Sequence, residues 1–351
     1  MKTILLIGAG LTRSQKPRAA LKSRPPLDAD FFQIAKAIEP TTTSEVMECL
    51  NSLVGDYSES LSESLETAAS YLYIKAIDNA AGSPYHLALL QLMKLLNIVL
   101  SQTTNTIRIG PRALLYRFIL SELRKVNNPE DLTIITFNYD LMVERALSAI
   151  AEHGHPDVFS FPGCYRIQGL TRTSGISGWP SFPDHGQFGH GGVPVLKLHG
   201  SMNWQSKHTS NTPTPSALFN SSREMHVLHS PVLPWDLSWR PRSRRVYLKP
   251  VIIPPVTGKR GMMHEKIMGL WSLAAEALQQ ADRVVVAGYS CPPLDLEARI
   301  LLSENMRANR DKRVYVVDPN PDVMGKFLEL CGVDHITFYT SVKNWIRDAA
   351  P

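Results

Sequence analysis

Polar and glycine residues follow five strand-like segments of the chain, at the point where each segment ends. These groups are Gly8-Ala9-Gly10, Asn138-Tyr139-Asp140, His199-Gly200-Ser201, Gly288-Tyr289-Ser290 and Asp318-Pro319-Asn320. In a parallel sheet, ligands bind beyond the carboxyl ends of the strands. Glycines there let the backbone approach a diphosphate, whose charge is met by amide donors and a helix N-terminus. We therefore expect the five groups to converge on one crevice for a phosphate-bearing ligand.

Asn138 and His199 have the chemistry needed to cleave an N-glycosidic bond. Cleavage creates an oxocarbenium-like ribosyl centre, which needs a polar group to place the nucleophile and a base to take up a proton. Histidine has the unperturbed pKa closest to neutral pH. Each residue also has an ordinary structural explanation: Asp140 as a helix cap, Asn138 as a turn residue and His199 as a core histidine. All three beside a glycine turn are hard to explain in that way.

Other catalytic motifs are incomplete. Arg13 occupies the place of the third glycine of the dehydrogenase fingerprint, and no acidic residue follows a second strand about 20 residues later. The glycine turn by itself also fits a tight strand-to-helix connection without a ligand. The pair His264-Glu265 lacks the second histidine of a zinc protease, and Gly288 lacks the second glycine of a nucleophile elbow. An ordinary dehydrogenase, a zinc protease and a serine hydrolase are therefore disfavoured.

The elements that must position these residues alternate in the C-terminal third. The pattern predicts helix 264–280, strand 283–288, helix 294–309, strand 314–318, helix 321–331, strand 335–339 and helix 341–349. Further strands are expected at 3–8, 132–137, 194–199 and 247–253. Alternating strands and helices imply a parallel sheet covered on both faces. Two stretches without sustained periodicity, 154–194 and 205–245, are expected to be long loops.

A helical unit separates the first two strands. Apolar residues recur at helical spacing over 31–38, and Pro84 and Pro111 stand where the first turn of a helix tolerates proline. We predict an α/β fold, a Rossmann-like doubly wound parallel sheet with an inserted helical domain. The sheet domain comprises residues 1–27 and 128–351, and the insertion comprises residues 28–127.

Composition is that of a globular protein, with 44% hydrophobic and 20% charged residues among 351. The net charge of +5 favours an anionic ligand, but it is too small and dispersed for a nucleic-acid site, so contact with nucleic acid would be indirect. Met1 leads directly into a strand, without a signal peptide or membrane span, and we expect a cytoplasmic protein. The four cysteines lie far apart, so no disulfide framework and no metal are expected.

Taken in order, the strand ends resemble the sirtuin superfamily. The segments Thr136-Phe137-Asn138-Tyr139-Asp140 and Lys197-Leu198-His199-Gly200-Ser201 carry the resemblance, together with the glycine turn at 8–10. Residues 137–141 and 198–204 look like segments of a divergent bacterial branch of NAD-degrading sirtuin-like proteins used in antiphage defence. The resemblance covers residues 1–12 and 132–340, and it leaves the helical insertion and both long loops unassigned.

The resemblance implies roles for individual residues. Asn138 would hold the nicotinamide ribose and the attacking water, Asp140 would accept from the carboxamide, and His199 would act as base on the ribose hydroxyls. NAD would be bound by residues at the other strand ends: Gly8, Ala9, Gly10, Thr12, Gly288, Ser290 and Asn320. Thr12 stands where the family usually has serine and keeps the hydroxyl. Asp30-Phe31 is the candidate for the segment that packs over nicotinamide.

The four-cysteine zinc module of sirtuin deacylases cannot form here, which favours NAD hydrolysis with water as acceptor. We expect an NAD glycohydrolase that releases nicotinamide and ADP-ribose and serves as a regulated antiphage effector. The resemblance implies a homo-oligomer and a separate ATPase or sensor protein as activator. Three alternatives stay open: an NAD-dependent protein deacylase, ADP-ribosyl transfer to another acceptor, and a non-catalytic sensor of NAD or ADP-ribose that signals through the insertion.

Overall fold

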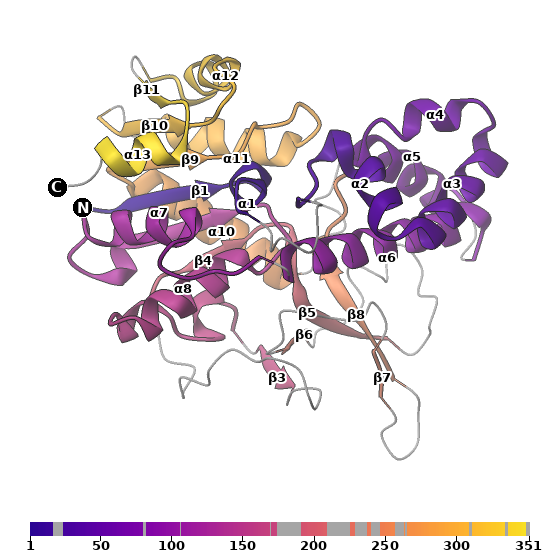
Figure 1. The fold of residues 1–351 in the computed structure, drawn as a ribbon, viewed down its shortest axis with the longest axis horizontal. Coiled ribbons are helices and arrows are strands. Elements are labelled where there is room, and N and C mark those ends of the chain that lie inside the picture. The colour runs from indigo at the N-terminus through magenta and orange to yellow at the C-terminus, as the bar shows by residue number, and fades with distance from the viewer. Residues whose placement is uncertain are drawn as a thin grey trace.

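A computed structural model of the chain describes residues 1–16, 24–79, 82–105, 107–168, 170–173, 191–208, 225–228, 237–239, 246–256, 263, 265–308, 311–333 and 336–348. Figure 1 shows a sheet domain that contains both chain termini and, beside it, a lobe of helices. A second, smaller sheet lies below the junction of the two. Because the site lies at this junction, each part is described for what it contributes there.

The large sheet has six parallel strands in the order β11-β10-β9-β1-β2-β4. Their bounds are β1 Thr3–Ile7, β2 Leu132–Thr136, β4 Val195–Lys197, β9 Arg283–Ala287, β10 Arg313–Val317 and β11 Ile336–Tyr339. The three central strands consist largely of aliphatic and β-branched residues, and nearly all of their residues are buried, as a sheet covered on both faces requires. This arrangement confirms the predicted α/β fold and its central strands.

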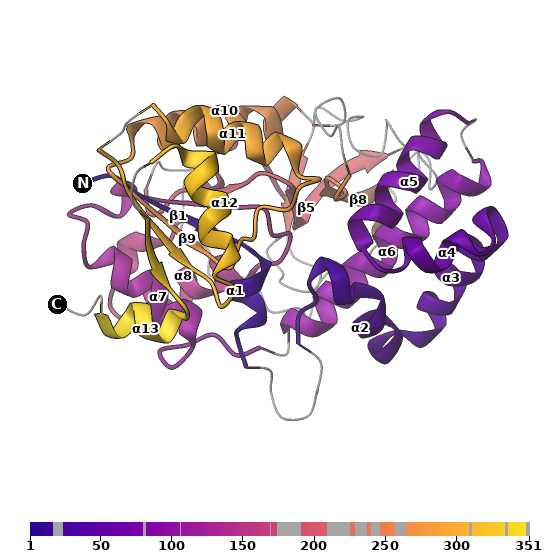
Figure 2. The same cartoon turned by 90° about the horizontal axis from the view of Figure 1, so that it is seen from above.

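Helices cover both faces of the large sheet (Figure 2). One face carries α10 (Glu265–Gln280), α11 (Leu296–Met306) and α12 (Asp322–Cys331). The other face carries α7 (Leu114–Leu123), α8 (Met142–Glu152) and α13 (Val342–Asp348). A short helix, α1 (Ala9–Arg13), follows β1 directly. Every crossover therefore leaves a strand's carboxyl end through a turn on the same edge of the sheet, which brings these turns together.

The helical lobe is inserted between α1 and α7. It consists of α2 Phe31–Ile38, α3 Pro40–Val54, α4 Tyr57–Leu61, α5 Leu65–Ile77 and α6 Pro84–Asn105. These helices bury a core of their own around Leu72, Leu89 and Leu92. Among the described residues, α6 is long and apolar enough to cross a membrane, and 67% of that window is buried inside the protein. The apolar composition of α6 is also that of a core helix, because α6 packs against α2, α3 and α5 of the lobe.

The insertion is shorter than the predicted range 28–127. Leu115, Phe118 and Ile119 of α7 belong to the core of the large sheet, whereas Leu100 of α6 is the last buried residue of the insertion that belongs to the core of the lobe. The spacing of apolar residues in α7 predicts a helix, but it does not indicate whether that helix packs against the lobe or against the large sheet. The sequence therefore placed the end of the insertion too late in the chain. Pro111 lies just before this helix, which begins at Leu114.

A second sheet occupies parts of the two stretches that the sequence predicted as loops. Its order is β3-β6-β5-β8-β7, with bounds β3 Thr171–Thr173, β5 Gly200–His208, β6 Met225–Leu228, β7 Leu237–Trp239 and β8 Val246–Ile252. Three of its strands have only three or four residues, too few for a clear alternation signal. Successive residues face opposite ways: Val227 packs into the core of the large sheet and Leu228 into the core of the lobe. This small sheet therefore connects the two cores.

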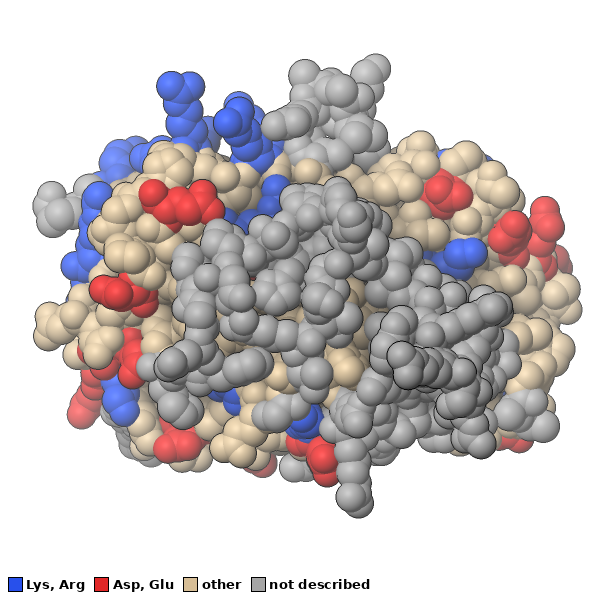
Figure 3. Space-filling view, turned by 90° about the horizontal axis from the view of Figure 1, so that it is seen from below, with Lys and Arg blue, Asp and Glu red and all other residues tan. Residues whose placement is uncertain are grey.

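Charge is distributed unevenly between the two parts. Residues 28–105 contain ten acidic and three basic residues, so the rest of the chain carries the net positive charge. On the face drawn in Figure 3, acidic side chains predominate at the end formed by the helical lobe, on the right, while both signs mix over the sheet domain on the left. The side chains that the structure describes on this face form no broad single-sign surface of the kind that binds a nucleic-acid backbone.

Candidate active site between the sheet and the helical lobe

A cavity of about 990 Å³ lies between the carboxyl edge of the large sheet and the helical lobe. The lobe contributes Phe31, Leu65, Glu66 and Leu96 to its wall. All five predicted strand ends reach it, and nine of the ten predicted site residues line it: Ala9, Gly10, Thr12, Asn138, Asp140, His199, Gly288, Ser290 and Asn320. Its volume lies at the upper end of the range for small-molecule sites and suits a dinucleotide.

Gly8, the tenth predicted site residue, is buried behind the cavity wall. The contacts of Gly8 and Gly10 with the turn at Gly288 explain why these positions are glycine. The amide of Gly8 donates to the Ala287 carbonyl at 3.0 Å, and that of Gly10 donates to the Gly288 carbonyl at 2.9 Å. A Cβ on Gly8 would lie 2.5 Å from the Cα of Tyr289. The turns after β1 and β9 thus pack backbone against backbone. Contact between these turns requires glycine at both, whether or not a phosphate binds above them.

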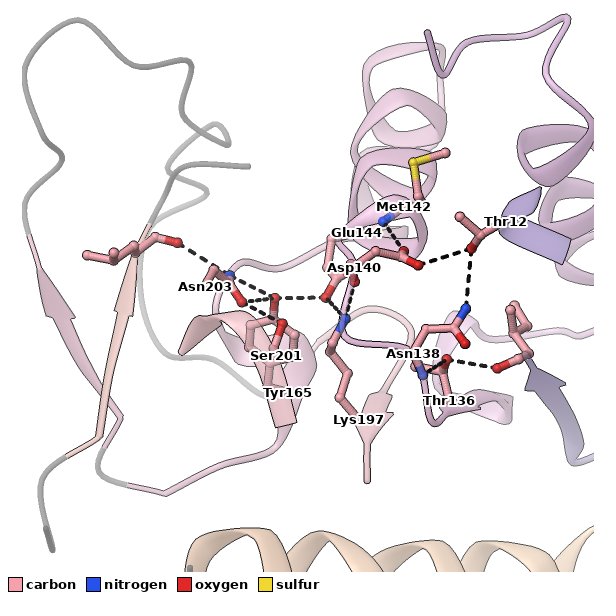
Figure 4. Close-up of polar contacts among 12 residues, drawn as sticks. Thr12, Thr136, Asn138, Asp140, Met142, Glu144, Tyr165, Lys197, Ser201 and Asn203 are labelled. Atoms are coloured by element: carbon pink, nitrogen blue, oxygen red, sulfur yellow. Dashed lines mark hydrogen bonds and ion pairs between the residues drawn. The ribbon is translucent and has the colours of Figure 1, made fainter. Parts of the chain in front are cut away.

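Thr12, Asn138 and Asp140 form one hydrogen-bonded chain on the cavity wall (Figure 4). The Asn138 side-chain amide donates to the Thr12 hydroxyl at 3.2 Å, and that hydroxyl donates to the Asp140 carboxylate at 3.2 Å. The other carboxylate oxygen accepts from the amide of Met142 at 2.9 Å, so Asp140 also caps the start of α8. All three side chains are at least nine-tenths buried. The amide oxygen of Asn138 is the atom of this chain that is best placed to accept from a ligand or a water.

His199 lies where β4 leads into β5, in a box of aromatic rings. Its ring centroid is 5.0 Å from that of Phe137 and 6.2 Å from that of Trp271. Its Nε2 lies 3.5 Å from Oδ1 of Asp295, whose Oδ2 accepts from the Tyr289 hydroxyl at 3.1 Å. A carboxylate beside an imidazole fixes the orientation of the ring and stabilises its protonated form. His199 thus lies on the cavity wall with a carboxylate beside its ring.

Asp295 is the residue that sequence reasoning missed. It directly precedes α11, where an acidic residue is explained by the helix start alone. Two tyrosines adjoin the same carboxylate. Burial, followed by the negative charge of Asp295, raises the pKa of Tyr139 and of Tyr289 well above the ordinary value. Both hydroxyls therefore stay protonated at neutral pH, and Tyr139 donates to the backbone oxygen of Ile253 at 2.8 Å.

Ser290 and Asn320 lie at the solvent-exposed end of the cavity. The side-chain oxygen of Asn320 accepts from the amide of Asp322, so this residue also starts α12. Burial raises the pKa of Asp318, two residues earlier, whose Oδ1 accepts from the Asn320 amide. Among the expected residues over the nicotinamide position, Phe31 lines the cavity, while Asp30 pairs with Arg13 at 2.5 Å.

Among the described residues, no group of three or more His, Cys, Asp or Glu side chains is placed to hold a metal ion. The thiols of the four cysteines are free, and Cys164, Cys291 and Cys331 are buried. His264, the histidine of the incomplete protease motif, lies outside the described residues.

The fold is a doubly wound α/β sheet, and its cavity lies at the carboxyl ends of the parallel strands, where proteins of this architecture bind ligands. No family model matches the chain, and no curated protein matches it. Among solved structures, it is similar to a Sir2 homologue in complex with NAD, with a TM-score of 0.38 and 12% identity over 99% of this chain and 87% of that one.

Two further solved structures match the chain with similar TM-scores and sequence identities. A mutant Sir2 homologue in complex with ADP-ribose has a TM-score of 0.42 and 12% identity, over 99% of this chain and 89% of that chain. Sir2 with a p53 peptide and NAD⁺ has a TM-score of 0.40 and 12% identity, over 99% of this chain and 91% of that chain. Because these scores and identities are low, the function is inferred from the residues of the chain itself.

Proposed function

We propose that the protein is an NAD⁺ hydrolase that cleaves the nicotinamide-ribose bond. A water molecule held by Asn138 attacks C1′ of the ribose, and the bond from C1′ to the pyridinium nitrogen breaks with its electron pair on the nitrogen. Neutral nicotinamide leaves, ADP-ribose forms, and the proton lost by the water is taken up by His199 and passes to solvent. The reaction thus consumes one NAD⁺ and one water and releases one proton.

One observation carries the proposal: the Thr12–Asn138–Asp140 chain and the His199–Asp295 pair line the same cavity. A buried amide with an available oxygen and a carboxylate-paired imidazole are the two groups that this hydrolysis needs. A protein that only bound nucleotide would have no chemical need for the His199–Asp295 pair. The carboxylates of Glu66 and Asp295 line the cavity as well, and their charge suits the cationic ring of NAD⁺ and the cationic ribosyl centre.

The cysteines support hydrolysis over deacylation. They are far apart in sequence, and three are buried, so they offer no four-cysteine zinc module of the kind that sirtuin deacylases carry. We further propose that the enzyme is a cytoplasmic antiphage effector that is kept inactive until an oligomer or a separate ATPase or sensor protein activates it. The acidic helical lobe, where Ile74 and Ile77 are exposed, is the proposed surface for that contact.

The test is NAD⁺ consumption by the activated assembly, or in cells that express the complete system, without an acyl-lysine peptide. We expect Asn138→Ala and His199→Ala each to lower the rate on the order of 10²-fold, the usual scale for a positioned acid-base group. ADP-ribose affinity should fall less, since most of the binding surface remains. The matched controls are Asn79→Ala and His155→Ala, at exposed positions outside the cavity lining.

The products distinguish the candidates. Nicotinamide and ADP-ribose in equal amounts support hydrolysis, whereas consumption that requires an acyl-lysine peptide supports the deacylase. If the assembly leaves NAD⁺ intact but binds ADP-ribose, the sensor is the better description. Asn138 and His199 variants that consume NAD⁺ as fast as the controls would show that the catalytic assignment is wrong.

A further inference from the structure

A buried lysine contacts the catalytic segment from behind the cavity. Lys197, the last residue of β4, has no exposed side-chain surface, and its ammonium group donates to the backbone oxygen of Asp140. It also pairs at 3.1 Å with Glu144 of α8, whose side chain is equally buried. Both residues lie outside the lining of the cavity, so neither would touch the substrate.

The polar chain continues from Glu144 into the small sheet (Figure 4). The Tyr165 hydroxyl donates to Glu144 at 2.9 Å and accepts from the Asn203 side-chain amide at 3.0 Å. Asn203 lies on β5, and its amide also donates to the backbone oxygen of Leu228 on β6 at 3.3 Å. Burial, followed by the charge of Glu144, raises the pKa of Tyr165 well above its ordinary value, so the hydroxyl keeps its proton.

Stability alone does not account for this ion pair. Removing two charges from water is costly, and a buried pair is often no more stable than well-packed apolar residues of similar volume. The pair is also incompletely satisfied, because no described residue hydrogen-bonds to Oε2 of Glu144. What the pair does provide is a fixed position for the Asp140 carbonyl. The adjacent side chains are the Thr12–Asn138–Asp140 chain of the cavity wall.

We infer that Lys197 is a positioning residue that holds the segment 138–140 in its productive place, and that Glu144 and Tyr165 couple this segment to the small sheet. The inference rests on the proposed hydrolysis for its kinetic readout. Displacement of a catalytic group by about 1 Å costs up to roughly 10²-fold in rate. Loss of the ammonium group should therefore lower kcat through Asn138 while most of the ligand-binding surface stays in place.

The first test replaces the pair by neutral side chains of similar size, Lys197→Met with Glu144→Gln, so that no unpaired charge stays buried. We expect kcat for NAD⁺ to fall on the order of 10-fold or more, with the dissociation constant of ADP-ribose changed about 2-fold or less. The matched control is Lys312→Met. Lys312 is also a buried lysine that donates to backbone oxygens, those of Leu278 and Asn305, but it lies outside the cavity lining. This control should leave kcat unchanged.

The second readout does not depend on hydrolysis. The amide of Asn138 donates to the hydroxyl of Thr136 at the end of β2, and that of Met142 donates to the carboxylate of Asp140, so their hydrogen exchange reports on the order of this segment. The double variant should speed exchange in residues 138–142 at least 10-fold and leave β1 and β9 unchanged. Tyr165→Phe removes only the hydroxyl and keeps the ring, whose centroid lies 5.0 Å from that of Trp204. This variant should also speed hydrogen exchange in residues 138–142. This variant keeps the inference testable if the double variant does not fold.

The outcomes separate the two proposals. If the wild-type assembly does not consume NAD⁺, the proposed function fails, and the positioning role is judged on exchange alone. Unchanged exchange in residues 138–142 in the folded variants would overturn the positioning role. So would equal losses of kcat, ADP-ribose binding and exchange protection throughout the sheet, because these would indicate a general structural role.

Discussion

Gly288 is expected to be indispensable because two backbone turns meet there. Its φ is +63°, and a Cβ on it would lie 2.7 Å from the carbonyl carbon of Gly10 and closer still to the amide of Leu11. These are backbone atoms of a turn held between β1 and α1, so they cannot rotate away as a side chain would. Replacement of Gly288 by alanine must therefore push the turns after β1 and β9 apart.

The cost has two parts. A side chain at a positive φ costs about 1–2 kcal/mol in any context. Separation of the turns also breaks the 2.9 Å hydrogen bond from Gly10 to Gly288, and an amide left without a partner in the interior costs about 1–3 kcal/mol. We expect Gly288→Ala to lower the free energy of unfolding by about 2–5 kcal/mol, the sum of these parts.

Gly332 provides the control for the first part. It ends α12 with φ at +60°, and a Cβ there would meet only the flexible side chain of Arg307, at 3.2 Å. Gly332→Ala should therefore cost only about 1–2 kcal/mol. Urea unfolding measures both variants, and calorimetry with ADP-ribose should show lost binding for Gly288→Ala alone. Equal free energies of unfolding for the two variants would refute the close contact between the turns.

Three further predictions follow from the site and its surroundings. Asp295→Asn keeps a partner for the Tyr289 hydroxyl but removes the carboxylate beside His199, so the rate of NAD⁺ hydrolysis should fall on the order of 10²-fold in a kinetic assay; a wild-type rate would contradict the pairing. Burial raises the pKa of Cys291 to about 11 and that of Cys331 to about 12, from 9.0, so the folded protein keeps protons that the unfolded chain releases first. Unfolding free energy should thus fall from about pH 9 to pH 12, and urea midpoints that stay level over this range would contradict the burial of these thiols. Elemental analysis should find no stoichiometric zinc, and one zinc per chain with unfolding on chelation would restore the deacylase.

The parallel sheet was predictable because its central strands carry their own signal. Runs such as residues 4–7 and 284–287 are aliphatic throughout, and the turn residues after them mark the ligand edge. Their convergence on one cavity then follows from topology, since parallel strands end on the same side. The positions of Asn138 and His199 could therefore be proposed from the sequence alone.

The small sheet and the buried pairs were not predictable for a physical reason. Strands of three or four residues are too short to show alternation, and their partners lie far away in the chain. Lys197 and Glu144 are 53 positions apart, and His199 and Asp295 are 96 apart. Each charged residue alone looks like an exposed one or a helix cap. Only the folded chain shows which opposite charge it meets.

The place of the insertion gives it mechanical access to the catalytic chain. Thr12 and Asn138 share a hydrogen bond although 126 positions separate them, and the helical lobe occupies most of the interval. In the chain, the lobe follows α1, which contains Thr12, and α7 then leads to β2, which ends two residues before Asn138. A rotation of the lobe against the sheet would thus act on Thr12 and, through the small sheet, on the Lys197–Glu144 pair. Because catalytic geometry tolerates shifts of only about 0.5 Å, a larger displacement of Thr12 or of this pair should lower the rate of the proposed hydrolysis.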